Sequence, residues 1–244
     1  MSNVVSNGAG NGAGNRGGAW ISVPMRDGHA LPVWQVAPLG ERKGSLILVQ
    51  EIFGVTDHIR DCCAEYAAEG YEVISPALFD RTEPGFEAGY SGADWEAAVK
   101  MGRERHSFDQ SLLDTSDCIK WFAAQHPESP LFIMGYCYGG SIAWRMAQTE
   151  PALYGASCFY GGYIATRYAD ETPLCATIAH FGRFDSMVEI APVERLIERQ
   201  HPTAQIFIYE AGHGFASDRR KDYHPLSADL AKDRTLQLFR VLGG

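Results

Sequence analysis

One cysteine stands between two glycines in the stretch Gly135–Gly139 (GYCYG), directly after the apolar run Leu131–Met134. A thiolate is a strong nucleophile, and a sharp strand-to-helix turn presents such a group to a substrate. The turn needs neighbours without side chains, because the returning helix would collide with any Cβ there. The pattern therefore predicts that Cys137 is a nucleophile at the tip of a tight bend. The alternative is a small buried cysteine in a glycine-rich turn.

Two later loops offer the base and the acid that a thiol nucleophile requires. His213 stands between two glycines just after the apolar run Gln205–Tyr209, and Asp185 lies shortly after the run Leu174–Ile178. Histidine can take and return a proton, while an aspartate beside it fixes the tautomer and stabilises the charged ring. The chain order of nucleophile, acid and histidine is that of the α/β-hydrolase fold. The alternatives are a surface-loop histidine and a turn-forming aspartate.

The oxyanion that forms when a thiolate attacks a carbonyl needs hydrogen-bond donors from the backbone. Tyr138, the residue after the nucleophile, supplies one N–H in an elbow of this kind. We expect the second from Ile52, which lies just after the apolar run Leu46–Val49. The imidazole of His213 and the N-terminus of the helix after the elbow would both favour the thiolate.

The elements that must position these groups alternate along the chain. Continuous apolar runs, typical of parallel strands buried on both faces, occur at 46–49, 71–74, 131–134, 156–160, 174–178 and 205–209. Helical spacing or capping residues indicate helices at about 57–69, 108–124, 140–148, 192–199 and 226–242. The sequence thus predicts the α/β-hydrolase fold, a mostly parallel central sheet covered by helices on both faces.

Two further segments complete the expected layout. Alternating runs over 20–25 and 30–36 flank Asp27 and Gly28, which predicts an N-terminal antiparallel hairpin at one edge of the sheet. The Gly- and Pro-rich stretch 79–92 shows no clear element, and we expect a loop that faces the substrate. Open α/β sheets place their sites beyond the carboxyl ends of the parallel strands, so the candidate catalytic residues should meet there.

The chain is long enough for one sizeable core. Its 244 residues are 45% hydrophobic and 11% aromatic, which fits a single domain over residues 19–244. Residues 1–18 are rich in glycine and asparagine and offer almost nothing apolar to bury. This composition predicts a disordered, flexible tail.

Charge and cysteine usage argue against several kinds of partner. The formal charge of −9 without a long basic run argues against nucleic acid and anionic membranes, so a small molecule is the expected partner. No stretch approaches the roughly 18 apolar residues of a membrane helix, and we expect a cytoplasmic protein. The six cysteines contain no CxxC pair and should be free thiols, five of them packed in the core. No metal-ligand cluster is visible in the sequence, so no metal is predicted.

The motifs together resemble those of the dienelactone hydrolase family of carboxymethylenebutenolidase-like enzymes. The resemblance runs from about residue 20 to 242 and rests on Gln50–Val55 (QEIFGV), Gly135–Gly140 (GYCYGG), the Asp185 loop and Gly212–Phe215 (GHGF). It implies hydrolysis of a small, anionic ester or enol-lactone through a thioester on the cysteine. Water would be the only other reactant, and no cofactor is expected.

The resemblance also implies two supporting roles. In the family a glutamate, matched by Glu51, hydrogen-bonds the resting thiol and releases it toward the histidine when substrate arrives. An arginine matched by Arg81 binds the substrate carboxylate, which its planar fork suits. Dienelactone-specific members carry a second such arginine four residues after the histidine, where this chain has Ser217, with Arg219 and Arg220 following. The alternatives are a plain strand-end carboxylate and a solvated arginine.

Two other functions stay open on the sequence. A promiscuous carboxylesterase from another pathway would carry the same residues, since one fold hosts many substrates. A non-catalytic redox or binding protein with this fold is the third reading. A complete triad with oxyanion donors argues against this third reading, because a full set of catalytic groups is hard to explain in a protein that does not catalyse a reaction.

Overall fold

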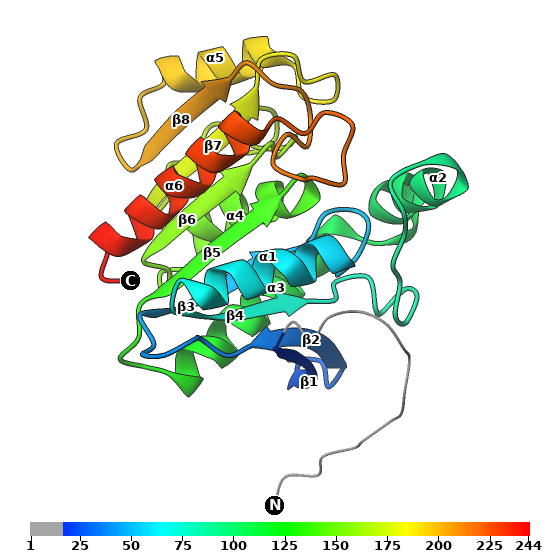
Figure 1. Cartoon of the computed structure of the whole chain (residues 1–244), viewed down its shortest axis with the longest axis vertical. Coiled ribbons are helices and arrows are strands. Elements are labelled where there is room, and N and C mark those ends of the chain that lie inside the picture. The colour runs from blue at the N-terminus through cyan, green and yellow to red at the C-terminus, as the bar shows by residue number, and fades with distance from the viewer. Residues whose placement is uncertain (1–16) are drawn as a thin grey trace, which may run out of the picture.

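The computed structural model describes residues 17–244. Within them, one sheet of eight strands forms the centre of the molecule, with helices on both faces (Figure 1). The flexible tail predicted over residues 1–18 lies outside the described residues except for its last two positions. Gly18 already belongs to the first strand, where it pairs with Val36.

The strands follow the order β1-β2-β4-β3-β5-β6-β7-β8 across the sheet. Neighbours from β4 to β8 are parallel, whereas β1 and β2 form an antiparallel hairpin and β2 pairs antiparallel with β4. Every residue of β3, β4, β5 and β6 is buried, which explains their continuous apolar sequences. The strands are β1 Gly18–Pro24, β2 Ala30–Val36, β3 Gly44–Val49, β4 Tyr71–Pro76, β5 Leu131–Tyr136, β6 Gly155–Phe159, β7 Ala176–Gly182 and β8 Ala204–Tyr209.

The helices form one layer on each face of the sheet. Helices α1 and α6 lie in front of it in Figure 1 and contribute Ile59 and Phe239 to one apolar core. Helices α3 and α4 lie behind it and contribute Ile119 and Trp144 to the other. The helices are α1 Asp57–Ala68, α2 Gly92–Lys100, the π-helix η1 Met101–Arg105, α3 Phe108–Gln125, α4 Tyr138–Thr149, α5 Ile190–Glu198 and α6 Pro225–Val241. This arrangement confirms the predicted α/β-hydrolase fold with its N-terminal hairpin.

The structure differs from the predicted elements in two places. Residues 92–105, for which no element was predicted, form α2 and the π-helical turn, because Ala98 and Met101 pack into the core. Strand β7 starts at Ala176 and continues to Gly182, where it pairs with Tyr209 of β8. Among residues 17–244, no helix combines the length and apolarity needed to cross a membrane.

Candidate active site

Cys137 lies on the bend between β5 and α4, with φ of 53° and ψ of −108°. Positive φ is uncommon for a residue with a side chain and persists only where surrounding contacts impose it. The Cys137 N–H donates to the carbonyl oxygen of Phe159 at 2.9 Å. A Cβ on Gly135 would strike the carbonyl of Gly139, and one on Gly139 would strike the carbonyl of Val49. The bend therefore requires glycine at both positions, at Gly135 because of the returning helix, as expected, and at Gly139 because of the neighbouring strand β3.

Three side chains from separate loops converge beside this bend. Nε2 of His213 lies 3.1 Å from Sγ of Cys137, and its Nδ1 lies 2.7 Å from Oδ2 of Asp185. The other oxygen of Asp185 accepts the N–H groups of Met187 and Val188, at 2.7 and 2.9 Å. These bonds hold the carboxylate, and the carboxylate in turn orients the imidazole so that one nitrogen faces the sulfur.

The surroundings of His213 favour its charged form. Burial lowers the pKa of His213, but the negative charge of the Cys137 sulfur and the hydrogen bonds to Asp185 and Cys137 outweigh this and raise it to about 10. Only 3% of the histidine side chain is exposed, so the surrounding protein screens these interactions weakly. An imidazolium beside the sulfur favours the thiolate, which is the nucleophilic form.

A cavity of about 390 Å³ opens over the sulfur and is large enough for a small molecule. Cys137 and His213 line it, and so do Ile52 and Tyr138, the two expected donors to an oxyanion. Tyr138 is the first residue of α4, so its N–H has no acceptor within the helix. The structure thus brings the elbow, the histidine and both donor residues to one cavity.

Cys137 is the most accessible of the six thiols. It is partly exposed, whereas the other five are buried, and burial raises the pKa of each of them: Cys62, Cys63, Cys118, Cys158 and Cys175. A raised pKa keeps a thiol protonated and inert at neutral pH.

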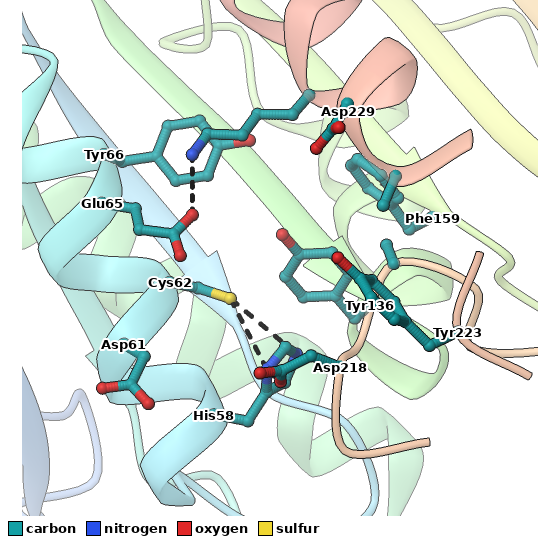
Figure 2. Close-up of a pocket in the computed structure, with 13 residues that line it drawn as sticks. His58, Asp61, Cys62, Glu65, Tyr66, Tyr136, Phe159, Asp218, Tyr223 and Asp229 are labelled. Atoms are coloured by element: carbon teal, nitrogen blue, oxygen red, sulfur yellow. Dashed lines mark hydrogen bonds and ion pairs between the residues drawn. The ribbon is translucent and has the colours of Figure 1, made fainter. Parts of the chain in front are cut away.

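A second cavity, of about 410 Å³, lies between α1, α6 and the ends of β5 and β6. Figure 2 shows Cys62 pointing toward His58 there, with Sγ 3.8 Å from Nε2 of the ring, while Nδ1 lies 3.6 Å from Asp218. A cysteine, a histidine and an aspartate meet here, as they do beside Cys137, but the distances between them are longer. Burial also raises the pKa of the Cys62 thiol. Cys62 is therefore a poorer nucleophile than Cys137.

Glu51 is buried next to Ile52 in the chain, and its carboxylate contacts a residue other than Cys137. Its side chain is 1% exposed, and Oε1 accepts a hydrogen bond of 3.2 Å from Nη1 of Arg220. The guanidinium of Arg220 also lies over the rings of Phe53 and Trp95, at 5.4 and 5.1 Å. In this structure the sulfur of Cys137 faces the histidine, so the thiol-modulating role of Glu51 stays a prediction.

Arg81 does not reach the cavity that holds the cysteine. Its Nε and Nη2 atoms meet the two oxygens of Asp114 at 2.8 and 2.9 Å, and Nη1 meets Asp27 at 2.8 Å. Both sides of the guanidinium are thus engaged by carboxylates of the protein itself. The geometry gives no support to the expected contact between Arg81 and a substrate carboxylate.

The sequence did not single out Arg103, yet this residue lines the cavity beside Cys137. It lies in η1, within the segment for which no element was predicted, so no pattern in the sequence pointed to it. Ser217 at the second arginine position is fully buried. Arg220, three residues later, is the cation that turns inward, whereas Arg219 pairs with Asp61 at the surface.

The fold and the site together define a class. A nucleophile on a strand-to-helix elbow, followed along the chain by an aspartate and a histidine that meet it, is the arrangement of an α/β-hydrolase. The sequence profile of the "Dienelactone hydrolase family" matches residues 31–242. The chain belongs to this family, which confirms the resemblance and the prediction of a carboxylic ester hydrolase.

Several relatives cover most of the chain. A protein of Yersinia pestis named "Putative carboxymethylenebutenolidase" is 34% identical over 215 residues, which span 81% of this chain and 78% of that protein. A protein of the same name from Synechocystis is 32% identical over 211 residues, spanning 80% and 85%. A crystal structure from Klebsiella pneumoniae, described as a "Putative Dienelactone Hydrolase", is 30% identical with a TM-score of 0.78, and the match covers 91% of this chain and 98% of that one.

Proposed function

We propose that the protein is a cysteine hydrolase that opens a small ester or enol-lactone through a thioester on Cys137. The observation that carries this proposal is the chain of contacts from sulfur to imidazole to carboxylate, at 3.1 and 2.7 Å, on the wall of a cavity. The names of the relatives support the substrate class, since carboxymethylenebutenolidases are named for opening a lactone.

The first half of the reaction forms the thioester. The thiolate of Cys137 attacks the carbonyl carbon, a C–S bond forms, and the carbonyl electron pair moves onto oxygen. The backbone N–H groups of Ile52 and Tyr138 stabilise this oxyanion. When the oxyanion collapses, the C–O bond to the leaving group breaks, and the departing alkoxide or enolate takes the proton from Nε2 of His213.

The second half releases the acid. The now neutral His213 takes a proton from a water molecule, which attacks the thioester carbonyl. The new tetrahedral oxyanion uses the same two donors, and its collapse breaks the C–S bond. Thiolate and imidazolium are restored, and Asp185 stabilises the imidazolium in both halves.

The test is acylation of Cys137 itself. With an activated aryl ester, intact-protein mass spectrometry should show one acyl group on the wild-type protein and none on Cys137→Ala. Turnover should fall by at least about a thousandfold in Cys137→Ala and in His213→Ala. The matched control is Cys62→Ala, which removes the other thiol that faces a histidine and should keep its activity. Full turnover by Cys137→Ala would refute the proposal.

A second candidate is a promiscuous carboxylesterase. One observation favours it: Tyr163, Met187 and Val188 give the cavity an apolar side that suits a neutral acyl chain. A panel of enol-lactones and linear esters of equal size decides between the two. A preference for lactones in kcat/KM supports the first candidate, and equal or better hydrolysis of linear esters supports the second.

A further inference from the structure

One guanidinium at the cavity beside Cys137 has no partner among residues 17–244. Arg103 lines the cavity and is exposed, and its side chain makes no hydrogen bond or ion pair with any residue of the described part of the chain. Its neighbour Arg105 lies in the same π-helix but pairs with Glu83 at 2.7 Å. Arg81, at the position expected to bind a carboxylate, is held by two carboxylates of the protein.

No negative side chain from the described part of the chain lines this cavity to balance the charge of Arg103. Among the described residues that line it there is neither an aspartate nor a glutamate. Asp185, the acid of the triad, is 1% exposed, and its carboxylate is engaged by Nδ1 of His213. A cleft lined by positive groups without carboxylates raises the local concentration of anions.

Packing of the neighbouring backbone fixes the position of Arg103 at the cavity. A Cβ on Gly102 would lie 2.7 Å from Cγ2 of Ile52, so the chain before Arg103 rests directly on an expected oxyanion donor. The segment is a π-helical turn, in which the His106 N–H donates to the Met101 carbonyl at 3.0 Å. Such turns occur often at functional sites, because the added residue changes which side chains face outward.

We infer that Arg103 binds an anionic group on the substrate, most simply a second carboxylate, and so selects charged esters over neutral ones. This inference rests on the proposed function. The planar fork of an arginine can hold both oxygens of a carboxylate, while Met187 and Val188 give the same cavity an apolar lining. Arg103 is a substrate-binding residue here, with no part in the bond-making steps.

The kinetic test compares two esters of one shape. The substrates are the para-nitrophenyl monoester of adipic acid and its analogue in which the free carboxylate is a carboxamide. Arg103→Gln should lower kcat/KM for the charged ester about tenfold and change the neutral one by less than about twofold. Arg103→Lys should recover part of the loss, since it keeps the charge without the fork. Arg105→Gln, the matched control, should change neither.

An equal fall on both esters, or no fall on the charged one, would overturn the inference. A binding measurement separates this failure from failure of the proposed function. Calorimetry with adipate on Cys137→Ala needs no turnover, and binding should be lost when Arg103→Gln is added. If the wild-type protein hydrolyses neither ester, the proposed function fails while the calorimetry still decides the anion site. Undiminished adipate binding in the variant that combines Cys137→Ala with Arg103→Gln would refute the role of Arg103.

Discussion

Nε2 of His213 lies 3.1 Å from the sulfur of Cys137, although 76 positions separate the two residues in the sequence. Asp185 holds the opposite side of the ring at 2.7 Å. The imidazole can therefore exchange a proton only at the nitrogen that faces the sulfur. The pKa of about 10 for His213 means that this ring stays charged well above the usual range of a histidine.

Asp185→Asn should lower the pH at which the charged ring loses its proton. The change removes a negative charge and a hydrogen bond that raise the pKa of His213, so the ring loses its positive charge at a lower pH. We expect kcat to fall by about a thousandfold or more. The ring-proton NMR signals of His213, followed as a function of pH, measure the first effect. Asp218→Asn, beside His58 in the second cavity, is the control, and an equal shift there would contradict the assignment.

Gly139→Ala should destabilise the protein by about 3 kcal/mol or more, because its new Cβ would strike the carbonyl of Val49 in the neighbouring strand. Backbone on both sides leaves no side chain that could move away. Gly162→Ala is the control, since a Cβ there would meet only Val188 at 3.9 Å. Urea unfolding measures both, and equal midpoints would show that the elbow tolerates a side chain.

Arg81→Ala should lower the stability of the protein and should not lower kcat/KM for charged esters more than for neutral ones. Asp114 is 1% exposed, and the change would leave its buried carboxylate without its main partner, at a cost of about 3 kcal/mol. Adding Asp114→Asn should restore part of this loss, because a buried amide costs less than an unpaired charge. Thermal unfolding tests both variants. A selective loss of kcat/KM on the charged ester would instead place Arg81 at the substrate.

Stability should fall as the pH drops below about 6.5, in part through His180. Burial, with a smaller effect from Arg234, lowers the pKa of His180 to about 3. Between these values the unfolded chain binds a proton that the folded protein does not, so the free energy of unfolding decreases by up to about 1.4 kcal/mol per pH unit. His180→Gln should show a shallower slope between pH 6 and 4, whatever its absolute stability. Parallel slopes would contradict this account.

The fold could be predicted from the sequence because its signals are local. Continuous apolar runs such as Leu46–Val49 indicate strands buried on both faces, and the Asp27-Gly28 turn indicates a hairpin. The segment 92–105 could not be predicted, because its helix and π-helical turn depend on packing of Ala98 and Met101 against distant residues.

The order and spacing of Cys137, Asp185 and His213 were enough to expect that they meet, since each follows a strand of one parallel sheet. Only the tertiary structure decided which arginine faces the cavity. Arg81, Arg103 and Arg220 carry the same chemical group, but Asp114 and Glu51 engage two of them. A guanidinium binds the nearest carboxylate, and whether that carboxylate belongs to the protein depends on residues that only folding brings together.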